Sequence, residues 1–86
     1  MKLVVCSVYD SASASFMTPF FMQSTGQAVR GFHDEINRIA EDNMLYKHPE
    51  DFVLFHLGSF DSDTGDFDLL SSEAQLLRGK DARKGE

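Results

Sequence analysis

The chain has 86 residues, 42% hydrophobic and 26% charged, which fits one globular domain and excludes a fully disordered chain. Its formal net charge is −6, and residues 1–77 alone hold four lysines and arginines against twelve carboxylates, a net −8. Such an acidic body excludes a protein that wraps duplex DNA, because neutralisation of phosphates supplies most of that affinity.

The N-terminal part of the chain predicts two strands. Leu3–Tyr9 is rich in valine and ends at the turn former Asp10, a pattern typical of a strand. A loop of small polar residues follows at 11–15. Pro19 then precedes the apolar run Phe20–Met22, which we expect at the edge of a sheet because proline cannot donate to a ladder.

A helix is predicted next. Ser24 can cap its first turn and Gln27 can complete a capping box. Gly31 lies in the interior, where glycine costs about 1 kcal/mol, and this favours a close approach of another group. Apolar residues recur at steps of three and four, which predicts an amphipathic helix of about 16 residues that fades near Asp42–Asn43. These apolar residues are Ala28, Val29, Phe32, Ile36, Ile39 and Ala40.

The remaining chain predicts a turn and a hairpin. His48–Asp51 is expected to turn, because the residue before a proline avoids the helical region. Phe52–Leu57 predicts a strand, Asp61–Gly65 a hairpin tip with a positive φ at its glycine, and Asp66–Leu70 the returning strand. Ser72–Leu77 fits either a short helix or a last extended segment.

These elements predict an α+β fold, with a small antiparallel sheet of three to four strands and one long amphipathic helix packed on one face. We expect one domain over residues 1–77 and a flexible basic tail over 78–86. Both main strands are apolar on both faces, whereas one helix covers only one face. A homodimer or another partner is therefore expected on the second face, with cover by residues 69–77 as the alternative. The expected surface comprises Leu3, Val5, Phe52, Leu54 and His56.

Residues with catalytic or metal-binding potential form no recognisable site. His33, His48 and His56 lack a second histidine or cysteine at metal-ligand spacing, and the aspartates of Asp61–Asp68 miss the positions of a calcium loop. Cys6, the single cysteine, sits in an apolar strand and is expected to be unreactive. We expect no enzyme activity, no cofactor and no metal.

The chain has few basic residues that could bind nucleic acid, and they lie in two short parts of the sequence. Single-stranded DNA is usually bound by exposed aromatic rings beside basic residues. Lys47, next to Tyr46, offers one such pair, and the other cations lie near the C-terminus. The candidate DNA-binding residues are Lys47, Arg78, Lys80, Arg83 and Lys84.

One stretch of the sequence indicates a protein family more specifically than the composition does. His48–Gly65, together with Val8–Ser11, Pro19–Phe21 and Ala28–Asn37, resembles the small nonstructural protein of gokushovirus-type microviruses, which are single-stranded DNA bacteriophages. The resemblance covers about residues 1–70 in order. It implies a non-virion protein of the host bacterial cytoplasm. No membrane segment is expected, because no apolar run approaches the roughly 18–20 residues needed to cross a bilayer. It also implies a C-type role, the switch to single-stranded genome synthesis and packaging into the procapsid.

Two hypotheses follow. In the first, this accessory protein contacts single-stranded DNA through the basic residues named above. In the second, it is a dimeric adaptor that binds replication or procapsid proteins without touching DNA. The acidic body favours the adaptor over a DNA coat.

Overall fold

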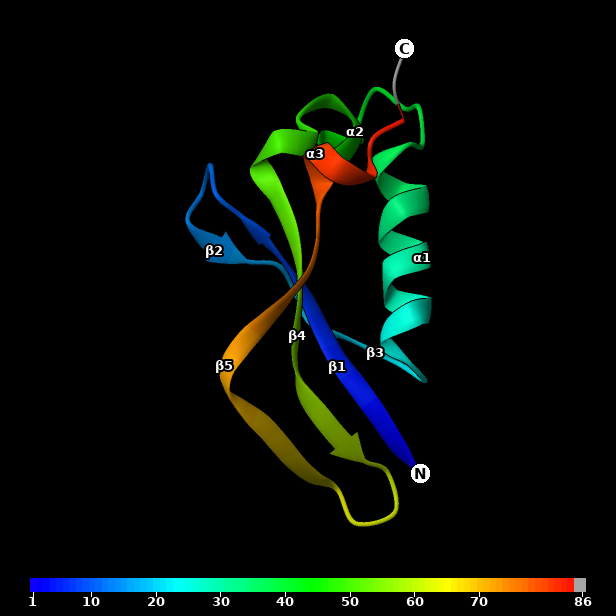
Figure 1. Ribbon diagram of the computed structural model, residues 1–86, viewed down its shortest axis with the longest axis vertical. Helices are drawn as coiled ribbons and strands as arrows, with labels where there is room; N and C mark the ends of the chain where they lie inside the picture. Colours follow the sequence, from blue (N-terminus) through cyan, green and yellow to red (C-terminus); the bar gives the residue numbers. More distant parts are fainter. Residues whose placement is uncertain (85–86) are drawn as a thin grey trace.

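The fold is built around one antiparallel β-sheet (Figure 1). The computed structural model describes residues 1–84. Its sheet has five strands in the order β2–β1–β4–β5, and β3 pairs with β1 as β2 does. In chain order the elements are β1 (Lys2–Asp10), β2 (Ser15–Phe16), β3 (Phe20–Met22), α1 (Thr25–Ile36), α2 (Met44–Lys47), the 3-10 helix η1 (Pro49–Asp51), β4 (Phe52–Asp61), β5 (Asp66–Arg78) and α3 (Gly79–Ala82).

The two short strands β2 and β3 lie along β1. Tyr9 lies opposite Phe16 and Cys6 lies opposite Phe20, so the segment between β2 and β3 holds one residue more than the facing part of β1. Pro19 falls in this interruption, where its missing N–H removes no ladder bond. The predicted edge strand is therefore confirmed.

β4 pairs with β1 over nine residue pairs and with β5 on its other side. Val8 lies opposite Leu54, whereas beyond a bulge at Leu57 the pairing continues with Val5 opposite Gly58. Only glycine fits at position 58, because a Cβ there would lie 2.5 Å from the backbone oxygen of Asp68 in β5. The hairpin between β4 and β5 turns where the sequence predicts it, with its glycine at a φ of +79°.

Helix α1 begins as predicted and ends earlier. The Ser24 hydroxyl accepts a hydrogen bond from the Gln27 N–H at 3.2 Å, which caps the first turn. The helix stops at Ile36 after 12 residues, not near Asp42–Asn43. Ile39, which continues the apolar spacing, is 79% exposed, so the buried stripe of α1 ends at Ile36.

The carbonyl groups at the end of α1 are satisfied by two asparagines. Asn37 Nδ2 donates to the His33 carbonyl at 2.8 Å and also to the Ala82 carbonyl in α3 at 3.0 Å. Asn43 Nδ2 donates to the carbonyls of Glu35 and Arg38, both at 2.8 Å. These bonds replace the helical ones that a longer α1 would make.

The core lies between α1 and one face of the sheet. Residues from β1, α1, β4 and α3 contribute to it, and partly buried residues from β3 and β5 pack around its margin. The buried members are Cys6, Val8, Ala28, Phe32, Ile36, Phe52, Leu54 and Ala82. The far part of the β4–β5 hairpin extends past the N-terminal start of α1 and has no helix over it (Figure 1).

The predicted fold class is wrong. The sheet has five strands and dominates the fold, and α1 is the only helix longer than four residues within residues 1–84. Two differences account for this. The loop after β1 doubles back and pairs twice with β1, and Ser72–Leu77 is extended because it continues β5 along β4.

The predicted start of the C-terminal tail falls at the end of β5. Gly79 is buried so closely that a Cβ there would lie 2.1 Å from the Pro49 carbonyl oxygen, and Ala82 is buried against the end of α1. The described residues of this segment, 78–84, thus pack on the domain. The rest of the predicted tail, 85–86, lies outside the described residues.

Candidate functional site

The face of the sheet opposite α1 is covered by rings instead of a helix. Strand pairing puts Leu3 beside Phe60, Val5 beside Phe21, and Tyr9 beside Phe16 on this side. Its apolar members define what we name the aromatic face: Leu3, Val5, Tyr9, Phe16, Phe21, Val53, Phe55, Phe60, Phe67 and Leu69.

Two clusters of rings form the aromatic face. At the α3 end of the sheet, the Phe16 ring lies 5.0 Å from that of Tyr9 and 5.6 Å from that of Phe55. Near the β4–β5 turn, Phe60 lies 4.8 Å from Phe67 and 5.5 Å from Phe21, again between ring centroids. Edge-to-face and tilted contacts of this kind fix the rings relative to one another. Phe67 stays 56% exposed and Leu69 63% exposed, so the surface is apolar and open to solvent.

Charge is segregated between the two faces. The carboxylates at paired positions of the sheet are Asp10, Asp61, Asp66 and Asp68, and all four share the side of Val8 and Leu54. At the paired positions of the aromatic face, Arg78 is the one charged side chain. At these paired positions the aromatic face thus carries no carboxylate, in a chain with a net charge of −6.

The predicted partner surface is corrected by the strand register. Leu3 and Val5 do lie on the side opposite α1, but Val5 is buried there, with 3% of its surface exposed. Phe52 and Leu54 instead belong to the core beneath α1, and Leu54 has no exposed surface. His56 lies opposite Cys6 on that same side, where its Nε2 lies 2.9 Å from the Gly58 carbonyl oxygen. The expectation that all five residues share one surface is therefore wrong.

The predicted DNA-binding cations are divided among different contacts. Arg78 donates to the Asp81 carboxylate at 2.8 Å. Arg83 lies 3.9 Å above the Tyr46 ring centroid and donates to the Tyr46 carbonyl at 2.6 Å. Lys84 lines the same hollow of about 260 Å³ as Arg83 and Tyr46. Lys47 follows Tyr46 at the end of α2, and Lys80 is exposed in α3.

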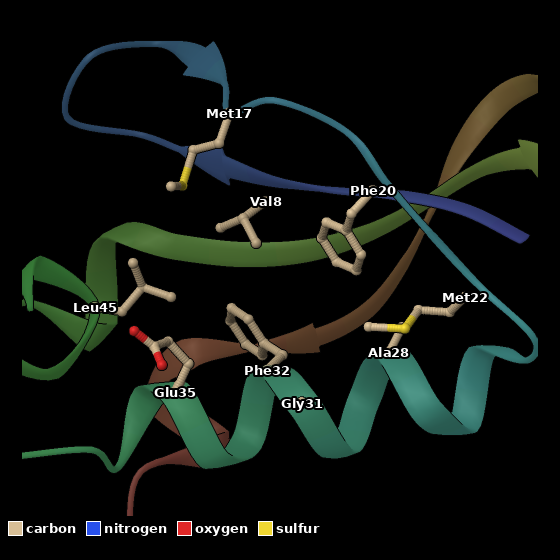
Figure 2. Close-up of a pocket in the computed structure, with 9 residues that line it drawn as sticks. All are labelled: Val8, Met17, Phe20, Met22, Ala28, Gly31, Phe32, Glu35 and Leu45. Atoms are coloured by element: carbon tan, nitrogen blue, oxygen red, sulfur yellow. The ribbon is translucent and has the colours of Figure 1, made fainter.

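An apolar pocket of about 350 Å³ opens between α1 and the strands (Figure 2). Phe32 on α1 faces Val8 and Phe20, while Met17 and Met22 lie toward its two ends. Glu35 is its one charged lining residue. The Arg38 guanidinium, which donates to this carboxylate at 2.7 Å, lowers the pKa of Glu35 below its usual value. The pocket therefore offers apolar contact and little polar recognition.

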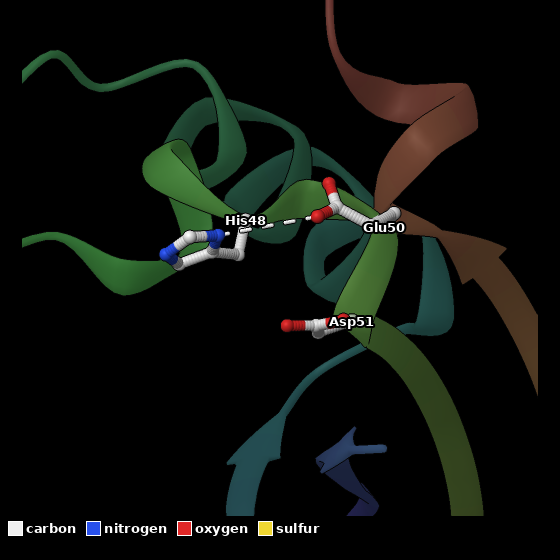
Figure 3. Close-up of side chains that lie close together, drawn as sticks. All are labelled: His48, Glu50 and Asp51. Atoms are coloured by element: carbon white, nitrogen blue, oxygen red, sulfur yellow. Dashed lines mark ion pairs between the residues drawn. The ribbon is translucent and has the colours of Figure 1, made fainter. Parts of the chain in front are cut away.

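One group of side chains within residues 1–84 has the composition of a metal site (Figure 3). Ligand atoms of His48, Glu50 and Asp51 lie within 4.8 Å of one another. His48 Nδ1 lies 3.9 Å from Glu50 Oε2, and both side chains are exposed. A local ion pair across the turn accounts for this arrangement, and we assign it no metal.

Comparison with known proteins gives the family. Residues 3–82 match the Phage ORF5 protein family. Protein ORF5 of Chlamydia phage 1 is 32% identical over 69 residues, which is 78% of this chain and 72% of that protein. The chain belongs to the Phage ORF5 protein family. The resemblance to gokushovirus-type microviruses is thereby confirmed, and the chain is a bacteriophage accessory protein. No solved structure matches it.

For this ORF5-family chain, sequence reasoning missed most of the aromatic face. Phe16, Phe21 and Phe67 lie in or beside expected loops and short strands, so their sequence positions gave no reason to group them. Alternation along Phe52–Leu57 did separate Phe55 from Leu54, and alternation along Asp66–Leu69 separates Phe67 and Leu69 from the two aspartates, so these patterns could have found part of the face. Within residues 1–84, no helix of this family member has the length and apolar character of a bilayer-crossing segment.

Proposed function

We propose that this chain is a non-enzymatic accessory protein in the switch to single-stranded genome synthesis and packaging in the host cytoplasm. It acts as an adaptor that binds a replication or procapsid protein through the aromatic face. The observation that carries the proposal is the pair of ring clusters on one face of the sheet, with exposed apolar side chains in each and the paired carboxylates on the other face.

The chemistry of the surface favours a protein partner. Exposed contiguous apolar patches on small proteins mark interaction sites, and interface centres are enriched in aromatic residues and depleted in charge. Nucleic acid would need several cations around the rings, whereas Arg78 is the one at paired positions and is engaged with Asp81. The acidic body around the face fits a partner with an apolar centre and a basic rim.

The test is direct binding between the purified chain and the replication and procapsid proteins of its phage. Phe16→Ser and Phe67→Ser each remove an exposed ring from one cluster. Because aromatic anchors dominate such interfaces, each substitution should weaken binding about tenfold or more.

Ile39→Ser is the matched control, since Ile39 is exposed but lies beside Tyr46 in the second hollow instead of on the aromatic face. Its affinity should match that of the unmodified chain. Binding to none of these proteins, or equal losses in Ile39→Ser and Phe67→Ser, would contradict the adaptor.

Contact with single-stranded DNA is a second candidate, favoured by one observation. Arg83 stacks on Tyr46, and Lys84 lines the same hollow, so two cations surround one ring. If this patch binds DNA, Lys84→Glu should abolish oligonucleotide binding, and affinity should fall steeply between about 50 and 200 mM salt. Binding that is absent at low salt removes this candidate and leaves the adaptor untouched.

A further inference from the structure

Gly31 lies in the middle of α1 without a contact that requires glycine. A Cβ added there would meet nothing within 4 Å among residues 1–84, although glycine in a helix interior is unfavourable compared with alanine. The residue is exposed and lines the apolar pocket between α1 and the strands (Figure 2). Glycine at this position therefore keeps the mouth of the pocket open for a group from outside residues 1–84.

The pocket follows the direction of α1. Ala28, Gly31 and Glu35 are spaced by three and four residues, so they form one side of it over about 10 Å of helix. Met22 lies at one end of the pocket and Leu45 at the other (Figure 2). A second helix laid along this opening would insert apolar side chains one turn apart over the same length.

The opposite wall of the pocket is held by hydrogen bonds. The Met17 N–H donates to the Val8 carbonyl at 2.8 Å, and the buried Ser7 hydroxyl donates to the Met17 carbonyl at 2.6 Å. The Met17 side chain is 46% exposed, and methionine adapts to apolar groups of different shape. The pocket is therefore formed before a partner binds, which lowers the entropic cost of binding.

Charge at the Glu35 end of the pocket indicates what kind of helix binds. Asp34 precedes Glu35 on α1, and its side chain is 77% exposed. Arg38 donates to the Glu35 carboxylate, so these two charges largely offset each other. Residues 34–42 nevertheless have a net charge of −3, from four carboxylates and this one arginine. A helix with cations beside its apolar residues would complement this rim.

The turn after α1 keeps two of these carboxylates near the pocket. Asn43 donates to the Glu35 carbonyl and accepts from the Leu45 N–H, so it joins two residues that line this end. Glu41 and Asp42 directly precede Asn43, and both are exposed. An acidic partner would therefore be repelled here, whereas lysine or arginine would be attracted.

We propose that this pocket is a second docking site, which binds the apolar side chains of a basic amphipathic helix from a partner protein. Gly31 lets that helix approach α1 closely, and its cations face the carboxylates of the rim. The pocket lies beneath α1, on the opposite side of the sheet from the aromatic face. The proposal thus goes beyond the adaptor function and does not depend on it.

The test is titration of the full chain with a short peptide of sequence LKKLLKLLKKLLKL, which is spaced to form a basic amphipathic helix. The peptide should bind saturably. Gly31→Leu should weaken binding about tenfold or more, because the added side chain fills the mouth of the pocket. This variant should stay folded, since leucine favours the helix and its Cβ meets no other group. Phe67→Ser, on the aromatic face, is the control and should bind like the native chain.

A second peptide tests the charge of the rim. It keeps the leucines and has glutamate in place of every lysine, and it should bind about tenfold more weakly or worse because the rim repels it. Equal binding of the two peptides would overturn the proposal.

Methyl-labelled methionine gives a readout that needs no variant. Met17 and Met22 line the pocket, whereas the amino group of Met1 contacts Asp63 at the β4–β5 turn. Saturation with the lysine peptide should shift the methyl resonances of Met17 and Met22 and leave that of Met1 unchanged. Shifts that exclude both pocket methionines would overturn the proposal.

Three further outcomes would contradict the docking site. They are no binding of the lysine peptide, native affinity in Gly31→Leu, and a loss in Phe67→Ser equal to that in Gly31→Leu. Sedimentation of the free chain tests a different occupant: a dimer that Gly31→Leu dissociates would assign the pocket to a second copy and overturn the proposal. Failure of the adaptor function is distinguishable, because it is measured with phage proteins and with Phe16→Ser and Phe67→Ser.

Discussion

Val8 in β1 and Leu54 in β4 lie directly opposite each other, and both side chains contact the core beneath α1. Leu54→Ala should therefore leave a cavity in the centre of this core and lower the free energy of unfolding by about 2–5 kcal/mol. Urea unfolding measures the loss. Leu69→Ala is the matched control, because Leu69 is exposed and the same truncation there should change stability by no more than about 0.5 kcal/mol. Equal losses at both positions would contradict the assignment of faces.

Asn43 joins the end of α1 to the start of α2. Its Nδ2 donates to the carbonyls of Glu35 and Arg38, its Oδ1 accepts from the Leu45 N–H at 3.1 Å, and the residue is buried. Asn43→Ala should lower the free energy of unfolding by about 1–3 kcal/mol, because it removes a cap and the side-chain donor to the Glu35 and Arg38 carbonyls; the Glu35 carbonyl then keeps only its bond from the Arg38 N–H. Asn43→Asp keeps the capping oxygen and loses the donors. If thermal unfolding finds Asn43→Asp as stable as the native chain, the bonds to α1 contribute nothing.

Two glycines should respond to alanine in opposite directions. At Gly31 an added Cβ would meet nothing within 4 Å, so Gly31→Ala should raise the free energy of unfolding by up to about 1 kcal/mol through helix propensity. At Gly79 the same Cβ would lie 2.1 Å from the Pro49 carbonyl oxygen, so Gly79→Ala should destabilise the fold. Chemical unfolding of both variants checks the pair, and a destabilised Gly31→Ala would indicate a contact that the fold does not show.

The ion pair between Glu35 and Arg38 predicts a small pH dependence of stability. Hydrogen bonding to Arg38 lowers the pKa of Glu35 in the folded chain, so in acid the unfolded state takes up this proton first. Its stabilisation is present above the ordinary glutamate pKa and is lost as the pH falls through the lowered value. Both side chains are about half exposed, so solvent screens the pair and the effect should be far below that of Leu54→Ala.

Glu35→Gln is the variant that isolates this pair. It should be slightly less stable than the native chain at neutral pH, and the two stabilities should converge in acid. Unfolding curves recorded across this range provide the comparison. A difference that stays constant with pH would assign the effect of the substitution to packing and not to charge.

Local patterns predicted where elements begin, because caps and turns depend on neighbouring residues. Ser24 at the start of α1 and the glycine of the β4–β5 turn both act over a few positions, and both predictions are confirmed. The end of α1 could not be predicted in this way. It depends on bonds that Asn37 makes to Ala82, 45 residues away, and on the exposure of Ile39.

The sequence also could not show which face of β1 and which face of β4 share one side of the sheet. Alternation correctly placed Phe52 and Leu54 on one side of β4 and Phe55 on the other, yet it could not say which side joins Leu3 and Val5. The register decides this, and a bulge at Leu57 shifts it between the two halves of β4. One face of the sheet was thus expected to lack helix cover. Which residues of β4 lie on that face became known only from the strand pairing.

The thiol of Cys6 lies in the central strand with no exposed surface, and burial raises its pKa. Thiol reagents attack the deprotonated sulfur, so this group is shielded twice in the native chain. Because the sequence has no other cysteine, a labelling dye can react only when the sheet around β1 opens. The rate at which Cys6 is labelled therefore reports how often the core opens. It can be measured for each variant without introducing another cysteine.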